Sequence, residues 1–306
     1  MVRIGKRGNR RRSSNLSISA ILFDEPVRHQ NRIVREITSR QNPLVSEYRA
    51  VASRQTPALT SVLLEGAHLI EEALAAGITV RSAAVGRRAL ADRNVAAVLE
   101  RLERGGADIV AVSEAVLRAM SPVPAPSGLV AIAEIVPIPL ARAFARPPQL
   151  VLIVFDLQDP GNTGAVVRSA EALNSTGVIF CGASADPFGW KALRGSMGSA
   201  FRLPVASIKD GGAAIAAARA AGLAIVAAMP AGGRSVVELD LTRPTAFLLG
   251  GEGRGLDPSI AAAADHRATI PMAARVESLN VSVAAALLAW EANRQRLRRQ
   301  EPDRHV

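Results

Sequence analysis

Polar side chains that could bind and polarise an oxygen-rich ligand gather in the second half of the chain, in residues 159–168, 249–256 and 270–282. The side chains of interest are Asn162, Arg168, Glu252, Ser278 and Asn280. Amide, carboxylate and guanidinium groups can orient a substrate and stabilise charge that develops on it. Ser196 and Ser199 lack the strand–turn–helix setting of an activated serine, so the sequence does not indicate a serine nucleophile.

The first segment is typical of a strand end that leads into a helix. Asp159-Pro160-Gly161 favours a turn and a helix start, where free backbone amides can meet an oxygen-rich ligand. Asn162 could either cap this helix or contact substrate. Arg168 lies almost two helical turns further on, where a structural role would accept any solvated residue. Arg168 is therefore a candidate functional residue.

The second segment is a glycine loop after an apolar run. Its glycines at 250, 251, 253 and 255 do not fit the G-x-G-x-x-G pattern of dinucleotide sites, because Leu256 stands where the third glycine belongs. This argues against a nicotinamide oxidoreductase. Glycines let backbone approach a ligand closely, and Glu252 can order the loop or meet substrate. Taken alone, the loop is better explained as a flexible turn with a solvated acid.

The third segment leads into the last helix of the chain. Ser278 or Asn280 is predicted to be the N-cap of a helix that runs from about residue 281 to 298. Capping requires one polar residue and does not explain the whole string 270–282. We therefore expect capping and ligand binding to coexist in this segment.

Two α/β units are predicted to position these segments. In the first unit, strands are expected at 61–65, 80–85, 109–112 and 129–135, with helices at 67–75 and 94–103. In the second, apolar strands are expected at 151–155, 177–180, 223–227 and 246–249. Strands that are apolar on both faces imply a mostly parallel sheet covered by helices.

The domain organisation follows from these patterns. We predict a basic arm over 1–34, a smaller α/β domain over 35–136, a proline-punctuated linker over 137–149 and a larger domain over 150–306. A disordered arm, an over-extended start and an organellar targeting segment all remain open for residues 1–34.

Composition narrows the functional class. The formal net charge is +10, and six cations precede residue 13, which favours a polyanionic partner. No apolar run approaches the ~20 residues of a membrane span, so we predict no membrane association. The four histidines are scattered without metal-ligand spacing, and no metal is predicted. Cys181 is the only cysteine and follows an apolar run, which suggests a buried thiol in a reducing, cytoplasmic protein.

Together, the three segments resemble the signature motifs of the SpoU/TrmH family of RNA ribose 2'-O-methyltransferases. The resemblance implies a trefoil-knotted α/β domain, S-adenosyl-L-methionine as cofactor, RNA as substrate and a homodimer with the pocket near its interface. Residues 39–44, 64–68 and 127–131 are similar to the accessory substrate-binding domain of the family, although Ser127 replaces the usual glutamine.

The resemblance also assigns roles to single residues. It implies that Asn162, Arg168, Glu252, Ser278 and Asn280 form the catalytic pocket. Backbone at Gly250, Ile270 and Leu279 would hold the cofactor, and Arg194 would contact RNA. Because a guanidinium stays protonated, we interpret Arg168 as an electrostatic stabiliser of the developing 2'-alkoxide rather than as a base.

The sequence therefore predicts S-adenosylmethionine-dependent methylation of a ribose 2'-hydroxyl, most simply in ribosomal RNA. Two alternatives remain: a transfer RNA 2'-O-methyltransferase, and a non-catalytic RNA-binding or ribosome-assembly protein that keeps the fold. The intact polar residues of the three segments argue against the non-catalytic alternative.

Overall fold

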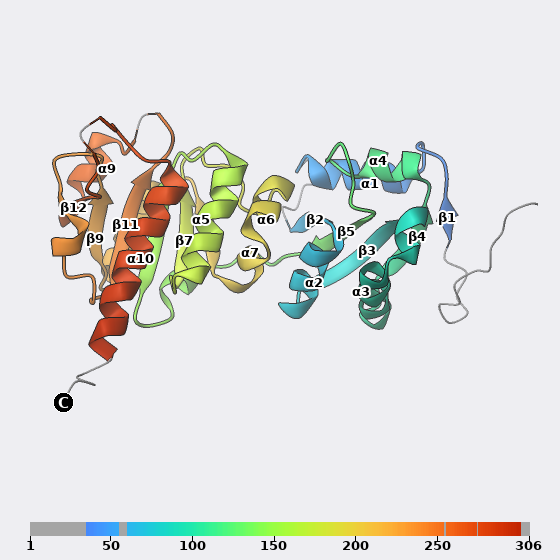
Figure 1. Cartoon of the computed structure of the whole chain (residues 1–306), viewed down its shortest axis with the longest axis horizontal. Helices are drawn as coiled ribbons and strands as arrows, with labels where there is room; N and C mark the ends of the chain where they lie inside the picture. Colours follow the sequence, from blue (N-terminus) through green and yellow to red (C-terminus); the bar gives the residue numbers. More distant parts are fainter. Residues whose placement is uncertain (1–34, 55–59, 254, 274, 301–306) are drawn as a thin grey trace, which may run out of the picture. The chain divides into compact units, whose positions relative to one another are not determined.

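The structure is a computed structural model that describes residues 35–54, 60–253, 255–273 and 275–300. The predicted basic arm, residues 1–34, lies outside these residues. The described chain forms a five-stranded sheet followed by a seven-stranded sheet (Figure 1). None of its helices is long and apolar enough to cross a membrane.

The smaller sheet is mixed and has the strand order β1-β4-β3-β5-β2. Its strands are β1 (Glu36–Ile37), β2 (Ser61–Glu65), β3 (Thr79–Gly86), β4 (Asp108–Val112) and β5 (Leu129–Glu134). The helices are α1 (Pro43–Ala52), α2 (Ala67–Ala75), α3 (Arg93–Arg104) and α4 (Glu114–Met120). The buried residues of α2 and α3 pack on one face of this sheet, and those of α1 and α4 on the other.

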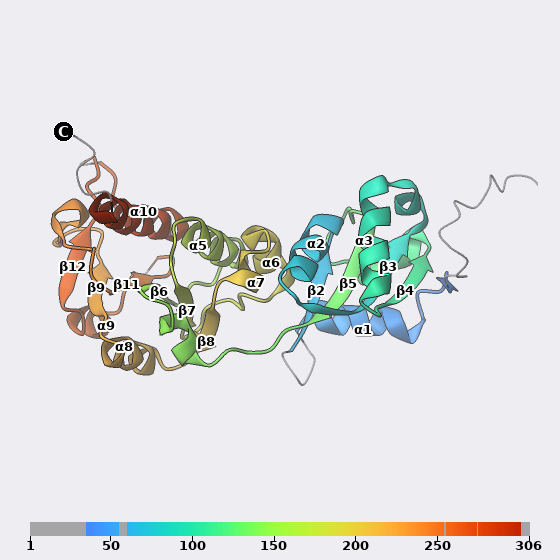
Figure 2. The same cartoon turned by 90° about the horizontal axis from the view of Figure 1, so that it is seen from below.

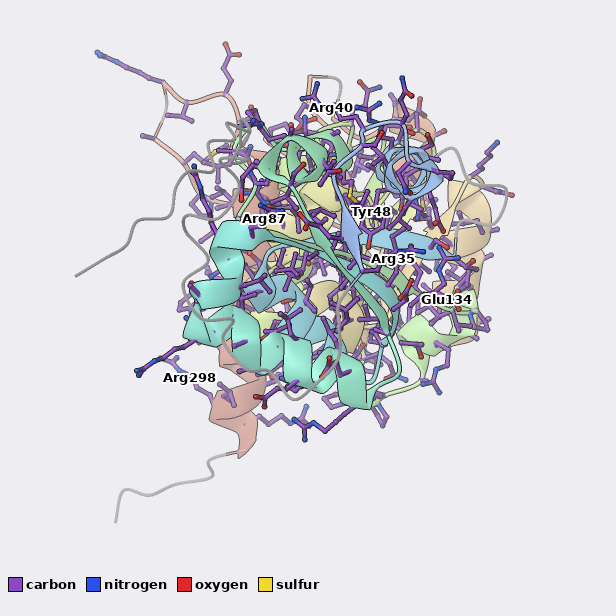
Figure 3. All side chains as sticks on the ribbon, turned by 90° about the vertical axis from the view of Figure 1, so that its right-hand side faces the viewer. Arg35, Arg40, Tyr48, Arg87, Glu134 and Arg298 are labelled. Atoms are coloured by element: carbon purple, nitrogen blue, oxygen red, sulfur yellow. The ribbon has the colours of Figure 1, made fainter. Side chains whose placement is uncertain are left out.

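Figure 3 looks onto the smaller sheet, with Tyr48 enclosed and arginines around it. Tyr48 is fully buried, and its hydroxyl lies 3.1 Å from Ser82 Oγ. Burial raises the pKa of this hydroxyl above its ordinary value. Arg40 and Arg87 are exposed; Arg40 donates to Ala115 O at 3.2 Å, and Arg87 forms an ion pair with Glu36.

The larger sheet is parallel throughout and has the order β10-β12-β9-β11-β6-β7-β8. Its strands are β6 (Leu150–Phe155), β7 (Gly177–Cys181), β8 (Val205–Ile208), β9 (Ala224–Ala228), β10 (Arg234–Ser235), β11 (Thr245–Gly250) and β12 (His266–Thr269). The helices are α5 (Pro160–Ala172), α6 (Trp190–Ser196), α7 (Ser199–Arg202), α8 (Gly211–Ala220), α9 (Pro258–Ala262) and α10 (Val281–Gln300). Figure 2 shows α5 and α10 on one face, and α8 and α9 on the other.

The central strand β6 shows why the sheet needs helices on both faces. All of its residues are buried. Leu152 and Val154 belong to the core shared with α5 and α10, whereas Val151 and Ile153 belong to the core shared with α8. Because side chains alternate along a strand, an uninterrupted apolar sequence requires cover on each side. The predicted parallel sheet is confirmed.

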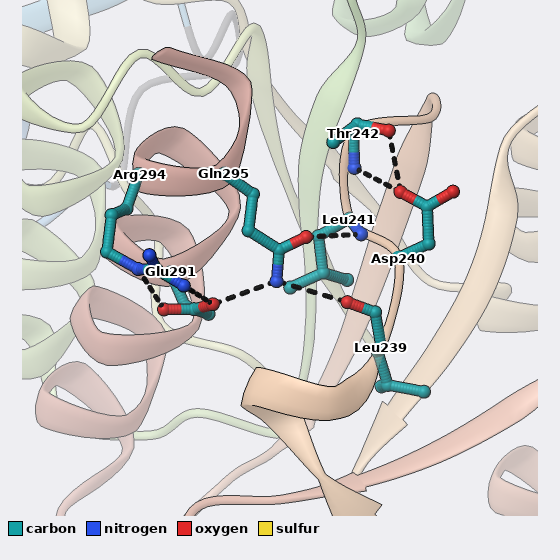
Figure 4. Close-up of polar contacts among 7 residues, drawn as sticks. All are labelled: Leu239, Asp240, Leu241, Thr242, Glu291, Arg294 and Gln295. Atoms are coloured by element: carbon teal, nitrogen blue, oxygen red, sulfur yellow. Dashed lines mark hydrogen bonds and ion pairs between the residues drawn. The ribbon is translucent and has the colours of Figure 1, made fainter. Parts of the chain in front are cut away.

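A polar network fixes α10 to the segment that precedes β11 (Figure 4). Gln295 Nε2 donates to Leu239 O at 3.0 Å, and Gln295 Oε1 accepts from Leu241 N at 2.9 Å. The same Nε2 donates to the buried carboxylate of Glu291. The hydrogen-bonded guanidinium of Arg294 holds the pKa of Glu291 below its ordinary value. Side chains on one face of α10 therefore form hydrogen bonds with backbone groups of the loop before β11 that are not paired in the sheet.

Arg296 extends this anchor to the start of β6. Its side chain is 8% exposed and donates to Leu241 O, Pro148 O, Gln149 O and Arg243 O at 2.8–3.2 Å. Burial lowers the pKa of the guanidinium, which interacts with backbone carbonyls instead of a carboxylate. Arg296 therefore joins α10 to the chain ahead of both β6 and β11.

Several local predictions can be compared with these elements. The expected helix at 94–103 is α3, and the expected final helix is α10. Cys181 ends β7 and is 1% exposed, as predicted, and burial raises its pKa to about 12. Residues 137–149 are not wholly irregular, because a 3-10 helix over Leu140–Phe144 buries Ala143 and Phe144 beneath the larger sheet.

We predict that Arg296→Met lowers the free energy of unfolding by about 3 kcal/mol, because buried carbonyls lose their donors. Urea denaturation would measure the change. The matched control is Arg298→Met on the exposed side of the same helix, which should change stability by less than about 0.5 kcal/mol. Equal effects of the two substitutions would contradict the anchoring role.

Candidate active site

A cavity of about 560 Å³ opens at the carboxyl ends of β9, β11 and β12. These strands are neighbours in the parallel sheet, so their ends meet at one edge. The apolar wall includes Leu249, Ile270, Leu279 and Leu288, and the polar residues include Glu252, Ser278 and Asn280. The volume lies within the range of about 300–1,000 Å³ that is typical of small-molecule sites.

The glycine loop after β11 forms one wall of the cavity through close backbone contacts. Gly251 and Gly255 form a bridge across the loop. A Cβ added to Gly250 would lie 2.0 Å from the Gly255 carbonyl carbon, and one added to Gly251 would lie 2.2 Å from Asp156 O. Neither position has room for a side chain. The loop therefore presents backbone to the cavity, as a site for an oxygen- or nitrogen-rich ligand requires.

The three polar segments meet in a chain of hydrogen bonds beside the cavity. Asn162 Nδ2, on the first turn of α5, donates to Glu252 Oε1 in the glycine loop. Asn280 Nδ2, at the start of α10, donates to Asn162 Oδ1 at 3.2 Å. Residues that are distant in sequence are thus linked side chain to side chain.

The caps of α5 and α10 explain how these residues are held. Asp159 Oδ1 accepts from Asn162 N at 2.7 Å, so Asp159 caps α5 and the Asn162 side chain is free to bond to Glu252. The sequence offered Ser278 and Asn280 as candidate N-caps of α10. The structure selects Asn280, because its Oδ1 accepts from Ser282 N at 2.8 Å. Ser278 instead lines the cavity.

The structure does not bring all predicted residues to this cavity. Gly250, Glu252, Ile270, Ser278, Leu279 and Asn280 line it. Asn162 joins it through its hydrogen bonds. Arg168 is exposed on α5 outside the lining, and within the described part of the chain it makes no hydrogen bond or ion pair. Arg194 is also outside the lining, in the last turn of α6 with a half-exposed side chain.

A tight helix crossing sets the position of α6 against α5. A Cβ added to Gly164 would lie 2.3 Å from Ala192 O and 2.9 Å from the backbone of Gly195. Gly164 is buried, so backbone packs directly on backbone at this crossing. The same two helices carry Asn162, Arg168 and Arg194, and their mutual placement depends on these glycines.

Sequence reasoning missed part of the cavity wall. Met229 and Pro230 follow β9, whereas Met272, which follows β12, lies within the segment 270–282 that the sequence had singled out. The ends of neighbouring parallel strands lie together, so the residues after the predicted strand 223–227 could have been included on that ground. No such signal existed for β12, which was not predicted. Among the described residues, no three His, Cys, Asp or Glu side chains cluster as a metal site.

Comparisons with known proteins match both parts of the chain. Residues 149–290 match the SpoU rRNA methylase family, and residues 54–131 match an MRM3-like substrate binding domain. An uncharacterized tRNA/rRNA methyltransferase of Synechocystis is 32% identical over 86% of this chain and 94% of its own length. The Bacillus subtilis 23S rRNA (guanosine(2553)-2'-O)-methyltransferase RlmP is 28% identical over 84% of this chain and 98% of its own.

A solved structure gives the same picture at the level of the fold. The AdoMet-bound rRNA methyltransferase of Sinorhizobium meliloti superposes with a TM-score of 0.76 at 30% identity. The match covers 85% of this chain and 98% of that one. The similarity therefore extends across both sheets.

We expect Gly164→Ala to destabilise the protein by about 1–3 kcal/mol, because the methyl group would collide with the backbone of α6. Thermal unfolding monitored by circular dichroism would measure the loss. Gly212→Ala is the matched control in α8, where the nearest atom to an added Cβ is a side-chain oxygen at 3.2 Å. A control that loses as much stability as Gly164→Ala would rule out the crossing as the cause.

Proposed function

The chain belongs to the SpoU rRNA methylase family, and on this premise we propose that it methylates a ribose 2'-hydroxyl of ribosomal RNA with S-adenosyl-L-methionine. The observation that carries the proposal is the cavity at the ends of β9, β11 and β12, where the three polar segments meet. We propose that the protein acts in the cytoplasm.

The cavity suits this cofactor chemically. Its apolar wall can enclose an adenine ring, and the backbone of the glycine loop can pair with the polar groups of a nucleoside. We propose that Gly250, Ile270 and Leu279 supply the backbone contacts. When bound, the cofactor would supply a methyl group on a positively charged sulfur. The ribose 2'-oxygen would bond to this methyl carbon as the carbon–sulfur bond breaks and a neutral thioether leaves, and the 2'-hydroxyl proton would pass to water or to an RNA phosphate.

The protein's main contribution to such a transfer is alignment and charge stabilisation. We assign Asn162, Glu252, Ser278 and Asn280 to the pocket that holds the ribose and the transferring group. Arg168 would stabilise the developing alkoxide and a neighbouring phosphate, since its permanent charge makes it a poor base. Its exposure and lack of a polar partner among the described residues leave the guanidinium available to RNA.

We also propose that residues 35–136 form an RNA-binding domain and residues 150–306 the methyltransferase domain. The match of residues 54–131 to a substrate binding domain supports the first role. Exposed arginines beside the smaller sheet could supply positive charge to a phosphate backbone, among them Arg88 in the 3-10 helix Arg87–Ala91. Arg40 and Arg87 are also exposed, although Arg40 donates to Ala115 O and Arg87 pairs with Glu36. Arg194 of α6 would add a further RNA contact.

Two further proposals concern assembly and topology. We propose a homodimer that pairs through α10, because Val283, Leu287 and Trp290 expose an apolar stripe at helical spacing, with 39–51% of each residue accessible. Helix α10 packs beside α5, which carries Arg168 (Figure 1). Pairing through α10 would therefore bring Arg168 close to the interface. We also propose a trefoil knot in which residues 270–280 pass the glycine loop before α10.

The function is tested by transfer of tritium from labelled S-adenosylmethionine into purified ribosomal RNA and bulk transfer RNA, followed by nuclease digestion. We expect the label on ribose in ribosomal RNA. If the label appears on ribose in transfer RNA alone, transfer RNA is the substrate instead of ribosomal RNA. Cofactor binding without transfer to either RNA would indicate an assembly intermediate as the substrate, whereas absence of cofactor binding would favour the non-catalytic alternative.

In this assay, Arg168→Ala should lower turnover by about 100-fold, the range seen when one electrostatic donor is removed from an active site. Calorimetric titration with S-adenosylmethionine should give an unchanged affinity, because Arg168 does not line the cavity. Arg219→Ala, an exposed α8 arginine, is the control. Equal losses of turnover and cofactor affinity in Arg168→Ala would reassign the residue to folding.

The dimer predicts that the double substitution Leu287→Glu and Trp290→Glu produces a monomer, since charges would be buried at the interface. Light scattering after size-exclusion chromatography would give the mass. Val136→Glu changes an exposed apolar residue outside α10 and should leave the dimer intact. A monomeric wild-type protein would refute the proposal.

A further inference from the structure

The amide of Asn280 is held in one orientation by Ser282. Asn280 Oδ1 accepts from Ser282 N at 2.8 Å and from Ser282 Oγ at 2.6 Å. The backbone N–H can bond only to the oxygen end of an amide, so the Asn280 Nδ2 group must face the other way, and the Ser282 hydroxyl adds a second bond to the same oxygen. That group donates to Asn162 Oδ1.

The same logic then fixes the orientation of Asn162. Because its Oδ1 accepts from Asn280, its Nδ2 is the end that faces the glycine loop. There it donates to Glu252 Oε1, and an ionised carboxylate can only accept. The hydrogen bonds thus run in one direction, from Ser282 through Asn280 and Asn162 to Glu252. Reversal of either amide would place two oxygens, or two N–H groups, against each other.

We propose that Ser282 is a positioning residue that sets the amide orientation of Asn280 and Asn162 and thereby holds the Glu252 carboxylate beside the cavity. Ser282 lies outside the cavity lining and acts only through its neighbours. This role rests on the proposed function, because the chain of hydrogen bonds ends in the pocket assigned to ribose.

Helix capping alone does not account for the Ser282 hydroxyl. The backbone N–H of Ser282 already satisfies the capping bond to Asn280. Ser259 makes the same pair of contacts at the start of α9, where its N and Oγ both donate to Asp257 Oδ1. The acceptor there is a carboxylate, whose two oxygens are equivalent, so no amide is oriented. Ser259 therefore makes the same helix-cap contacts as Ser282 but is not connected to Asn162 by hydrogen bonds, which makes it a matched control.

The first test measures turnover and cofactor affinity in four variants. Ser282→Val and Ser282→Thr differ by the hydroxyl and have nearly the same shape. We expect Ser282→Val to lower kcat about fivefold, roughly the factor of one neutral hydrogen bond, while Ser282→Thr restores kcat. Ser282→Ala should behave like Ser282→Val, and Ser259→Ala should leave kcat unchanged. Cofactor affinity should stay constant in all four.

Two outcomes would overturn the proposal. An unchanged kcat in Ser282→Val and Ser282→Ala would show that the hydroxyl has no part in positioning. Equal losses of kcat and melting temperature in Ser282→Ala and Ser259→Ala would reduce Ser282 to a helix cap.

A second measurement does not depend on turnover and separates this proposal from the proposed function. The side-chain amide resonances of Asn162 in ¹⁵N-labelled protein should shift in Ser282→Val, although Ser282 does not contact Asn162. They should return toward their wild-type positions in Ser282→Thr and stay unchanged in Ser259→Ala. Unmoved Asn162 resonances in Ser282→Val would refute the positioning role. If the resonances shift as expected but the wild-type protein transfers no methyl group, only the proposed function would be refuted.

Discussion

Parallel pairing in the larger sheet is the constraint on which the candidate site depends. In a parallel sheet, every strand ends at the same edge, so the residues that follow β9, β11 and β12 must meet there. β11 ends in the glycine loop, and β12 leads into the segment 270–282, which carries Ser278 and Asn280. The cavity follows from this alignment, and it needs no dedicated domain or inserted loop. The apolar strands require helices on both faces of the sheet. These helices leave the edge at the carboxyl ends of the strands open to a ligand.

Close contacts between backbone segments fix the position of the glycine loop at this edge. Gly250 and Gly251 leave no space for side chains, and the bridge across the loop keeps its backbone in place. Gly164 acts in the same way where α5 crosses α6. These contacts are rigid because they involve backbone rather than flexible side chains, and they hold Glu252 and Asn162 within hydrogen-bonding reach of each other.

Arginines serve two physically distinct purposes in this chain. Arg296 is buried, and its guanidinium donates hydrogen bonds to backbone carbonyls. These bonds fix α10 to the start of two central strands. Arg168 is exposed and, within the described residues, unpaired. A guanidinium with satisfied donors stabilises the fold, whereas one with free donors remains available for a phosphate or a developing negative charge. The overall positive charge therefore says less about RNA binding than the hydrogen-bonding state of each arginine.

The sequence alone determined the elements with strong apolar runs, because burial on both faces leaves an unmistakable pattern in β6, β7 and β11. It also determined the family and the segments 159–168, 249–256 and 270–282, whose residue types are tied to their chemistry. It did not reveal β12, whose four residues include one buried side chain, or the alanine-rich α8, whose apolar periodicity is weak. Only the tertiary structure decided that Asp159 rather than Asn162 caps α5, that Asn162 turns to Glu252, and that Arg168 stands outside the cavity. The choice between the candidate caps of α5 depends on whether the Asn162 side chain bonds to its own helix start or to Glu252, which lies 90 residues further along the chain. Local sequence patterns carry no information about such distant contacts.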